Sequence, residues 1–225
     1  MKANALETVT APLPHREGAG ESPLLSTAYF PPVQWFTKLL EGRIFVEACE
    51  TFHKQTYRNR CLIDSPQGAL ALTVPVVHEQ TDIRHLRLSD HGHWRRQHWQ
   101  ALTSSYMNSP FFEFYEDDFR PFFTDEWEFL FDFNAAIVRK VCELIDLDAQ
   151  MLPTTTYEKE SANDLRDLIS PKHSWQADAQ FRPQPYYQVF APQHGFLPNL
   201  SIADLLFNMG PETLLVLHRC RSEIL

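Results

Sequence analysis

Short apolar runs separated by turn residues dominate the first part of the chain and predict strands. The run over residues 24–30 predicts a buried strand, which Pro31 and Pro32 end. Apolar residues then recur at helical spacing over residues 33–40 until Gly42, and residues 44–48 predict a second strand. A strand, a helix and a strand at this spacing permit a right-handed parallel crossover.

The pattern continues with strands and then changes to helices after Asp90. Residues 55–63 and 69–77 predict two strands, joined by the turn residues 64–68 as a hairpin, and residues 83–88 alternate as a further strand. Beyond Asp90 the apolar spacing is helical. It predicts a helix over residues 94–106, a helix with Ser109 as its cap and Pro110 as its first residue, and an amphipathic helix over residues 127–145 capped by Thr124 or Asp125.

The last part of the chain combines an irregular segment with one capped helix. Residues 171–198 contain five prolines, which predicts irregular chain with a short strand at residues 186–190. Ser201 predicts the cap of a helix that runs to Met209, with Asp204 at the capping-box position and Gly210 and Pro211 at its end.

These elements predict one α/β domain over residues 23–225. Its mixed sheet would have one parallel crossover and antiparallel hairpins, with the helices concentrated after residue 90; an α+β fold is the alternative. Residues 1–22 lack the apolar core of a signal peptide and predict a disordered leader. No run approaches the ~18 apolar residues of a membrane span, so we expect a cytoplasmic protein.

The charge of the chain excludes some classes of ligand and favours others. A net charge of −9 argues against nucleic-acid binding, and the chain has neither G-x-G-x-x-G nor a P-loop. Residues 24–100 carry nine Lys and Arg against seven Asp and Glu, whereas residues 101–225 carry nine against nineteen. A small anionic ligand would therefore favour the first of these halves.

Neither the cysteines nor the histidines predict a metal or disulfide framework. The four cysteines are widely separated, which is typical of reduced thiols, and Cys61 reads as a buried strand thiol more readily than as a reactive one. His91, His93 and His98 do not share a helical face, so we expect no metal site.

The segment over residues 52–60 is the strongest candidate for a binding site. As an extended strand it would place Lys54, Arg58 and Arg60 on one side and Gln55, Tyr57 and Asn59 on the other. The cations could hold an anionic ligand. In that case Arg58→Ala and Arg60→Ala should each weaken ligand binding and leave the fold largely intact. The alternative is a solvated edge strand, in which the same charges prevent aggregation.

Two further positions could take part in chemistry. His98 shares a helical stripe with Trp94, Leu102 and Tyr106, so it is either a general base or a core histidine bonded to the backbone. Tyr29 lies where the first strand meets a helix, the edge at which α/β sheets bind ligands.

Taken together, these segments resemble the WbqC-like protein family. The resemblance spans residues 24 to about 211 and rests on the following strings: Tyr29-Phe30-Pro31-Pro32, Lys54-Gln55-Thr56-Tyr57-Arg58-Asn59-Arg60, Leu72-Thr73-Val74-Pro75-Val76, His98-Trp99, Tyr106, Ser109-Pro110-Phe111-Phe112, Tyr187-Gln188-Val189-Phe190, and Leu200 to Asn208. In front of Lys54 the family pattern looks like Glu-Asn-aromatic, whereas this chain has Glu50-Thr51-Phe52-His53. The family has no settled reaction.

The resemblance implies a role in bacterial surface-polysaccharide biosynthesis. We expect an enzyme that transfers an acyl or aminoacyl group to a nucleotide-linked amino sugar, with His98 as base. The substrate would be held by Lys54, Gln55, Tyr57, Arg58, Asn59, Arg60, Tyr29 and Tyr106. A non-catalytic binding or assembly subunit and a small-molecule sensor are the alternatives. The sequence assigns no cofactor, donor, acceptor or oligomeric state.

Overall fold

The structure, a computed structural model, describes residues 22–77 and 82–222. The disordered leader predicted for residues 1–22 lies, apart from Ser22, outside the described residues.

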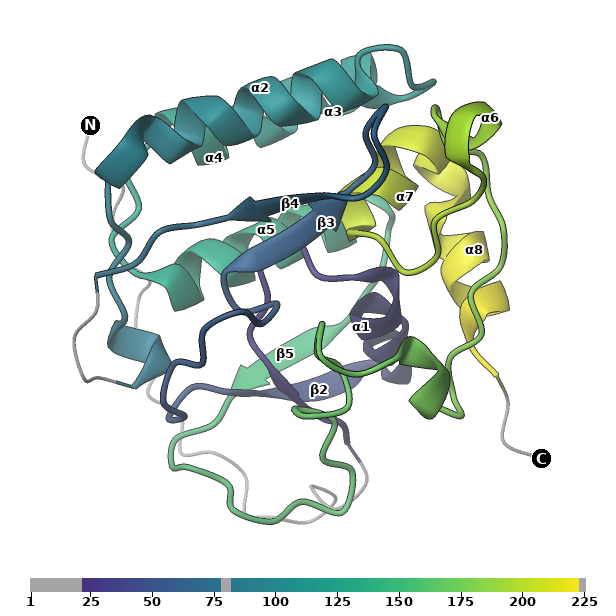
Figure 1. The fold of residues 1–225 in the computed structure, drawn as a ribbon. Coiled ribbons are helices and arrows are strands. Elements are labelled where there is room, and N and C mark those ends of the chain that lie inside the picture. Colours follow the sequence, from purple (N-terminus) through teal and green to yellow (C-terminus); the bar gives the residue numbers. More distant parts are fainter. Residues whose placement is uncertain (1–21, 78–81, 223–225) are drawn as a thin grey trace.

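A three-stranded parallel sheet forms the base of the molecule (Figure 1). Its strand order is β1-β2-β5, with Leu24 of β1 opposite Phe45 of β2 and Phe45 opposite Leu152 of β5. The three strands are β1 (Leu24–Ser26), β2 (Arg43–Glu47) and β5 (Gln150–Pro153). The helix α1 (Val33–Thr37) and the 3-10 turn η1 (Lys38–Glu41) join β1 to β2, and Gly42 ends them in a left-handed conformation. The predicted parallel crossover is therefore confirmed.

The antiparallel pairing lies in a separate sheet. Strands β3 (Arg60–Ile63) and β4 (Leu70–Thr73) form the predicted hairpin, with Cys61 opposite Leu72. Parallel and antiparallel pairs together confirm the α/β class, although each kind of pairing has its own sheet.

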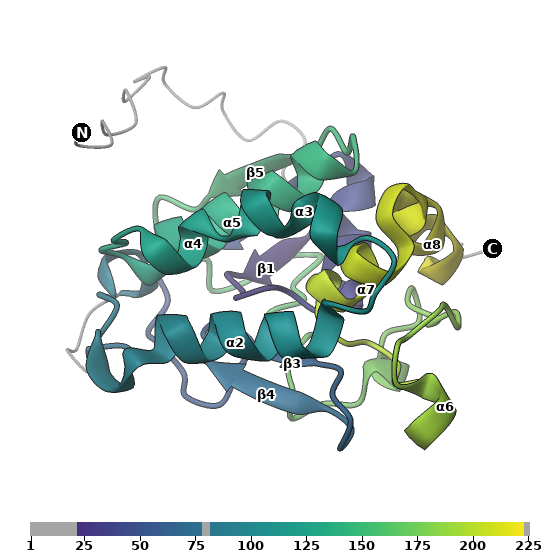
Figure 2. The ribbon, with the colours of Figure 1, turned by 90° about the horizontal axis from the view of Figure 1, so that it is seen from above.

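Most helices follow residue 90, as predicted, and α2 runs along the hairpin on the side away from the parallel sheet (Figures 1 and 2). They are α2 (Trp94–Tyr106), α3 (Phe112–Phe119), α4 (Pro121–Thr124), α5 (Leu130–Leu144), α6 (Ala191–His194), α7 (Ile202–Met209) and α8 (Thr213–Cys220). Short 3-10 turns are η2 (Ile83–His85), η3 (His91–His93), η4 (Trp175–Ala177) and η5 (Gly210–Glu212). In the part of the chain that the structure describes, no helix has the length and apolar character needed to cross a membrane.

Three predicted strands are wrong over part or all of their length, and in two of them the backbone bonds elsewhere. Residues 55–59 form a loop with a turn at Tyr57 and Arg58, and the Tyr57 carbonyl accepts from the Tyr29 amide at 2.9 Å. Residues 83–88 begin with η2, because the Asp82 side chain accepts from the amide of His85 and closes a turn. Residues 186–190 likewise form no strand.

The predicted helix starts are less accurate than the helices themselves. Helix α3 begins at Phe112, since the Ser109 hydroxyl donates back to the Tyr106 carbonyl and does not cap the helix. Helix α5 begins at Leu130 with no side-chain cap. Ser201 does cap α7, through a bond from the amide of Ala203. The pattern missed β5, α4, α6 and α8, each of eight residues or fewer.

Aromatic rings form much of the core between the helices and the sheets. Tyr29 stacks on Phe133 of α5 with centroids 5.8 Å apart, and Phe30 stacks on Phe123 of α4 at 6.4 Å. Phe30 has a φ of 38°, which is uncommon for a residue with a side chain. Its ring is 1% exposed, so burial holds this strained junction between β1 and α1 in place.

Candidate functional site

A cleft of about 460 Å³ opens where the loop over residues 52–59 meets the end of β4 and the segment before α2. We call it the loop cleft. Its polar lining consists of Lys54, Gln55, Asn59, Arg60, Thr73, Ser89 and His91, and its apolar lining of Phe52, Val74, Pro75 and Val76. Four residues of the binding segment predicted from the sequence therefore meet at one cleft.

The two cations of the loop cleft are available to a ligand. Lys54 is exposed and Arg60 is half-buried, and within the described residues neither makes an ion pair. The Nε of Arg60 donates to the Thr73 hydroxyl at 3.1 Å. The two terminal guanidinium nitrogens of Arg60 can therefore bind a ligand. Gln55 has a φ of 59°, so the loop is strained next to the cleft, as is common at ligand-binding positions.

Asn59 connects the loop to the hairpin at the wall of the cleft. Its side-chain nitrogen donates to the Val74 backbone carbonyl at 2.7 Å, and its backbone carbonyl accepts from the Val74 amide at 2.8 Å. Among the described residues its side-chain oxygen has no partner, although it is buried. This oxygen is an acceptor that a water or ligand donor would satisfy.

Arg58 lies outside the loop cleft in a buried ion pair. Its Nε donates to Glu50 Oε1 at 2.8 Å, and its Nη2 donates to Glu50 Oε2 at 2.5 Å and to the Ser26 hydroxyl at 2.7 Å. Arg58 is 7% exposed and Glu50 5%. The turn at residues 57–58 breaks the two-residue alternation of a strand, so Arg58 does not share a side with Lys54 and Arg60.

Tyr29, Tyr57 and His98 lie in the core behind the cleft. The Tyr29 hydroxyl is 2.9 Å from His98 Nδ1. Burial lowers the pKa of His98 to about 4, so the ring is neutral at pH 7. Burial also raises the pKa of Tyr29 and of Tyr57. His98 is 5% exposed, and its Nδ1 is occupied by the Tyr29 hydroxyl.

Tyr106 belongs to a different buried network, which is centred on Asp204. Its hydroxyl donates to Asp204 Oδ1 at 2.8 Å, while the Tyr186 hydroxyl and the Gln188 amide donate to Oδ2 at 2.6 and 2.9 Å. Burial raises the pKa of Asp204 to about 6, and these donors oppose that rise. Sequence reasoning missed the network, although Gln188 and Asp204 both lie in strings that resemble the family.

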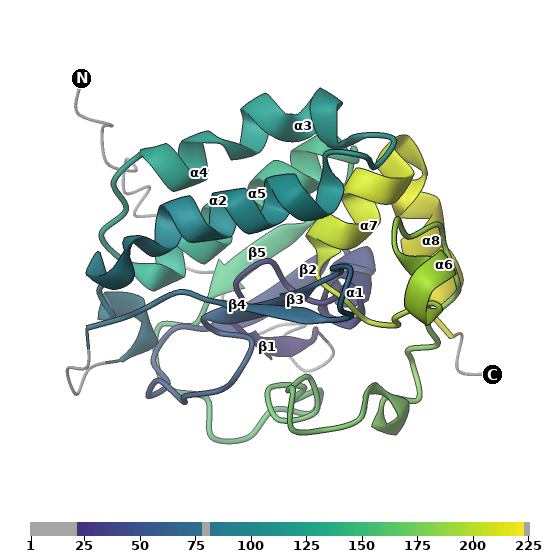
Figure 3. The same cartoon turned by 45° about the horizontal axis from the view of Figure 1, so that its top comes forward.

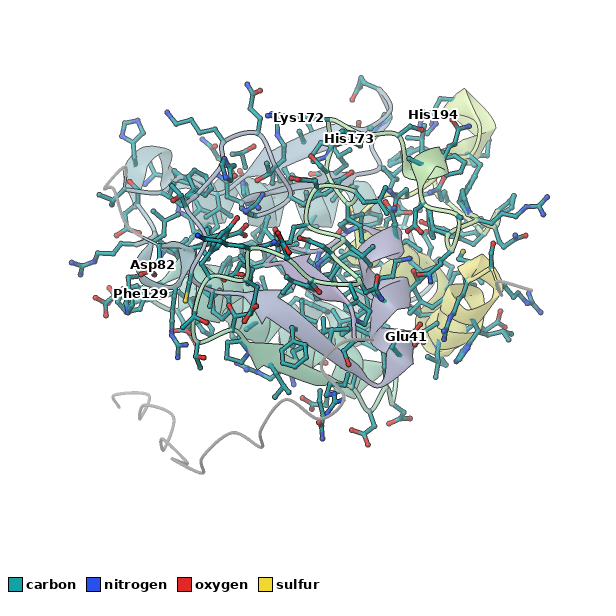
Figure 4. All side chains as sticks on the ribbon, turned by 90° about the horizontal axis from the view of Figure 1, so that it is seen from below. Glu41, Asp82, Phe129, Lys172, His173 and His194 are labelled. Carbon is teal, nitrogen blue, oxygen red and sulfur yellow. The ribbon has the colours of Figure 1, made fainter. Side chains whose placement is uncertain are left out.

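A second ion pair that the sequence did not indicate joins Asp64 to His194. His194 Nε2 lies 3.0 Å from Asp64 Oδ1, and its Nδ1 lies 2.9 Å from the Gly195 carbonyl. Desolvation lowers the pKa of His194, but these acceptors and the Ser65 carbonyl raise it by more. Figure 4 shows His194 at the side of the molecule opposite Asp82. The pair spans 130 positions of sequence, which no local pattern reveals.

The described residues contain no group of three or more His, Cys, Asp or Glu side chains that could hold a metal ion. His91 lines the loop cleft and His98 is buried behind it, so these two histidines do not converge.

Comparison with known proteins identifies the family of this chain. The model of the WbqC-like protein family matches residues 27–180. The uncharacterized protein Rv1507c of Mycobacterium tuberculosis (strain ATCC 25618 / H37Rv) is 25% identical over 202 residues, which cover 76% of this chain and 85% of that protein. No solved structure matches.

We predict that Arg58 is required for the fold and Arg60 is not. Arg58→Ala leaves the Glu50 carboxylate buried without its partner, which should cost roughly 3–5 kcal/mol of unfolding free energy. Arg60→Ala removes one bond at a half-exposed site and should cost about 1 kcal/mol or less. Urea unfolding of both variants measures the difference, and equal losses would contradict the structural role of the ion pair.

We predict that His98 makes the protein less stable in acid. The unfolded chain binds a proton at this residue below about pH 6.5, whereas the folded protein binds it only below a pKa of about 4. Stability from the neutral ring is therefore full above pH 6.5 and is lost as the pH falls towards 4, by roughly 3 kcal/mol. Asp204, whose pKa is raised, makes the unfolding free energy change with pH in the opposite direction over this range. Comparison of the variant with wild type removes this contribution, because both contain Asp204.

The measurement is the difference in unfolding free energy between wild type and His98→Gln from pH 4 to pH 7. This difference should increase with pH. A difference that does not change with pH would mean that the folded pKa of His98 is ordinary.

Proposed function

Because this chain belongs to the WbqC-like protein family, we propose that it acts in bacterial surface-polysaccharide biosynthesis. We infer a cytoplasmic enzyme whose substrate is a nucleotide-linked amino sugar. The enzyme would transfer an acyl or aminoacyl group to that sugar. The loop cleft carries this proposal, since it brings Lys54 and Arg60 together with uncharged polar groups in an otherwise acidic protein.

The charges of the loop cleft favour an anionic ligand. Its lining includes Lys54 and Arg60 but no Asp or Glu. Arg60 has a planar fork that can bind two oxygens of one phosphate or carboxylate, and Lys54 supplies a compact charge. These two groups would hold an anionic group at the sugar end of the substrate, such as a carboxylate.

The remaining lining suits a hydroxylated ring. Gln55, Asn59 and Ser89 offer donors and acceptors, and the half-buried Phe52 offers an apolar surface on which a sugar face can lie. A volume of about 460 Å³ is typical of small-molecule sites.

For the general base we favour His91 over His98, which the sequence suggested. His91 is exposed and lines the cleft, whereas His98 is buried with its Nδ1 2.9 Å from the Tyr29 hydroxyl. In the proposed step the amine of the sugar attacks the carbonyl carbon of the donor. The amine proton passes to His91, and the leaving group of the donor departs as the new amide bond forms.

A non-catalytic binding or assembly subunit is the second candidate, and one observation favours it. The lining of the loop cleft contains neither a carboxylate nor a thiol that could act as a nucleophile. Cys61 is 1% exposed, and burial raises the pKa of its thiol, so it is unreactive in place.

We predict that Lys54→Ala and Arg60→Ala each weaken the binding of nucleotide-linked amino sugars by roughly tenfold, because each removes one charge-assisted bond worth about 1.5–3 kcal/mol. Isothermal titration measures the affinity. Lys172→Ala is the matched control, since Lys172, which Figure 4 labels, is exposed and is not part of the cleft lining. Unchanged affinity in both cleft variants would place the substrate elsewhere.

Turnover separates the enzyme from the binding subunit. With an acyl or aminoacyl donor present, we predict that His91→Gln lowers the rate by roughly 10²–10⁴-fold and leaves substrate affinity within a few-fold of wild type. His53→Gln, an exposed histidine outside the cleft lining, is the control. Saturable binding without any turnover in the wild-type protein would favour the binding subunit.

A further inference from the structure

A second cleft of about 470 Å³ lies between the start of α2 and α4. These two helices run side by side in Figure 3. We call it the helix cleft. Three arginines and three aromatic rings line it, namely Arg95, Arg96, Arg120, Trp94, Trp99 and Phe123.

The helix cleft retains positive charge after its internal ion pairs are counted. Arg95 pairs with Asp90, and Arg120 pairs with Glu116. Arg96 is exposed and has no ion-pair partner among the described residues. Asp90 is the single acidic residue in the lining. The cleft can therefore accept an anion without displacing an existing pair.

Its arginines lie over the faces of its indole rings. The Arg120 guanidinium lies 5.2 Å from the centroid of the half-buried Trp99, and Trp99 packs on Phe123 at 5.5 Å. Arg95 lies 4.8 Å from the Trp94 ring. Indole rings and guanidinium planes are the groups on which nucleobases stack.

The amide end of α2 adds donors at the same place. This helix of 13 residues begins with Trp94, Arg95 and Arg96, and its cap residue His93 makes no side-chain bond to it. Uncapped amides and the helix dipole favour a phosphate group.

The two clefts share one wall. Ser89 and His91 line the loop cleft, whereas Asp90 and His93 line the helix cleft. Gly92 and His93 both have left-handed backbones, with φ of 78° and 51°, which turns the chain sharply between the two clefts. A ligand with two parts can therefore occupy both clefts across this segment.

We propose that the helix cleft binds the nucleotide part of the substrate. The base stacks on Trp99 and Arg120, and the diphosphate binds Arg96 and the amide end of α2. The sugar crosses the segment over residues 89–93 into the loop cleft. The placement of the sugar rests on the proposed function, while the nucleotide site rests on the helix cleft alone.

The test uses nucleoside diphosphates without a sugar. UDP, dTDP, GDP, CDP and ADP are titrated into the full-length protein by calorimetry, with tryptophan fluorescence as a second readout because Trp94 and Trp99 line the cleft. We expect at least one of them to bind and to quench the fluorescence. Arg96→Ala should lower its affinity by roughly tenfold, and a rise in salt should lower it further.

Two matched variants make the result specific. Lys172→Ala, an exposed lysine outside the lining of either cleft, should leave diphosphate affinity unchanged, and Trp99→Leu should lower both affinity and quenching. Circular dichroism confirms that each variant folds; Arg96 is exposed, so its loss leaves the core intact.

The outcomes separate this inference from the proposed function. If no diphosphate binds, or if Arg96→Ala keeps wild-type affinity, the nucleotide site is refuted even where Lys54 and Arg60 variants weaken sugar binding. If diphosphates bind through Arg96 while those variants have no effect on nucleotide-sugars, the nucleotide site stands and the sugar site in the loop cleft fails.

Discussion

The buried ion pair between Arg58 and Glu50 is the interaction on which the arrangement of the site depends. Glu50 follows β2 and Ser26 ends β1, so the guanidinium ties the loop to the carboxyl edge of the parallel sheet. The Arg58 carbonyl accepts from the Asn134 side chain of α5 at 2.8 Å, which fixes the same turn from the other side. A buried pair of charges is tolerated when its bonding groups are satisfied, and here three of the bonds to the guanidinium come from protein oxygens. With Arg58 held inward, Lys54 and Arg60 are left at the cleft.

Burial shifts the pKa values of two titratable groups in the core in opposite directions. Desolvation favours the neutral form of each, which lowers the pKa of His98 and raises that of Asp204. His98 bonds to Tyr29, and Asp204 bonds to tyrosines from α2 and from the Pro-rich segment. These networks connect elements that are distant in sequence. A buried polar network whose donors and acceptors are all hydrogen-bonded favours one packing arrangement of those elements.

The short segment before α2 links the fold to both clefts. Its Ser89 amide donates to the Pro75 carbonyl at 3.0 Å, and its Ser89 carbonyl accepts from the Trp94 indole at 2.8 Å. The segment is thereby held between the hairpin and the helix. Side chains that alternate along it reach one cleft or the other, so a few residues can position both parts of a bipartite ligand.

The sequence by itself determined the regular elements whose signals are local. The 3.6-residue spacing predicted α2 and most of α5, Ser201 and Gly42 marked helix ends, and the strand-helix-strand order predicted the parallel crossover. The strings from Tyr29 to Asn208 together also indicated the family, and the one from Lys54 to Arg60 picked out four residues that line the loop cleft.

Only the tertiary structure decided which cation is structural and which is free. Arg58 and Arg60 look equivalent in sequence, but a turn at residue 58 and a carboxylate at residue 50 separate them, and both depend on contacts outside the segment. The pairing of Asp64 with His194 and the network around Asp204 are likewise long-range. Periodicity reports on neighbours along one element, whereas burial and electrostatic partners are set by which elements pack together.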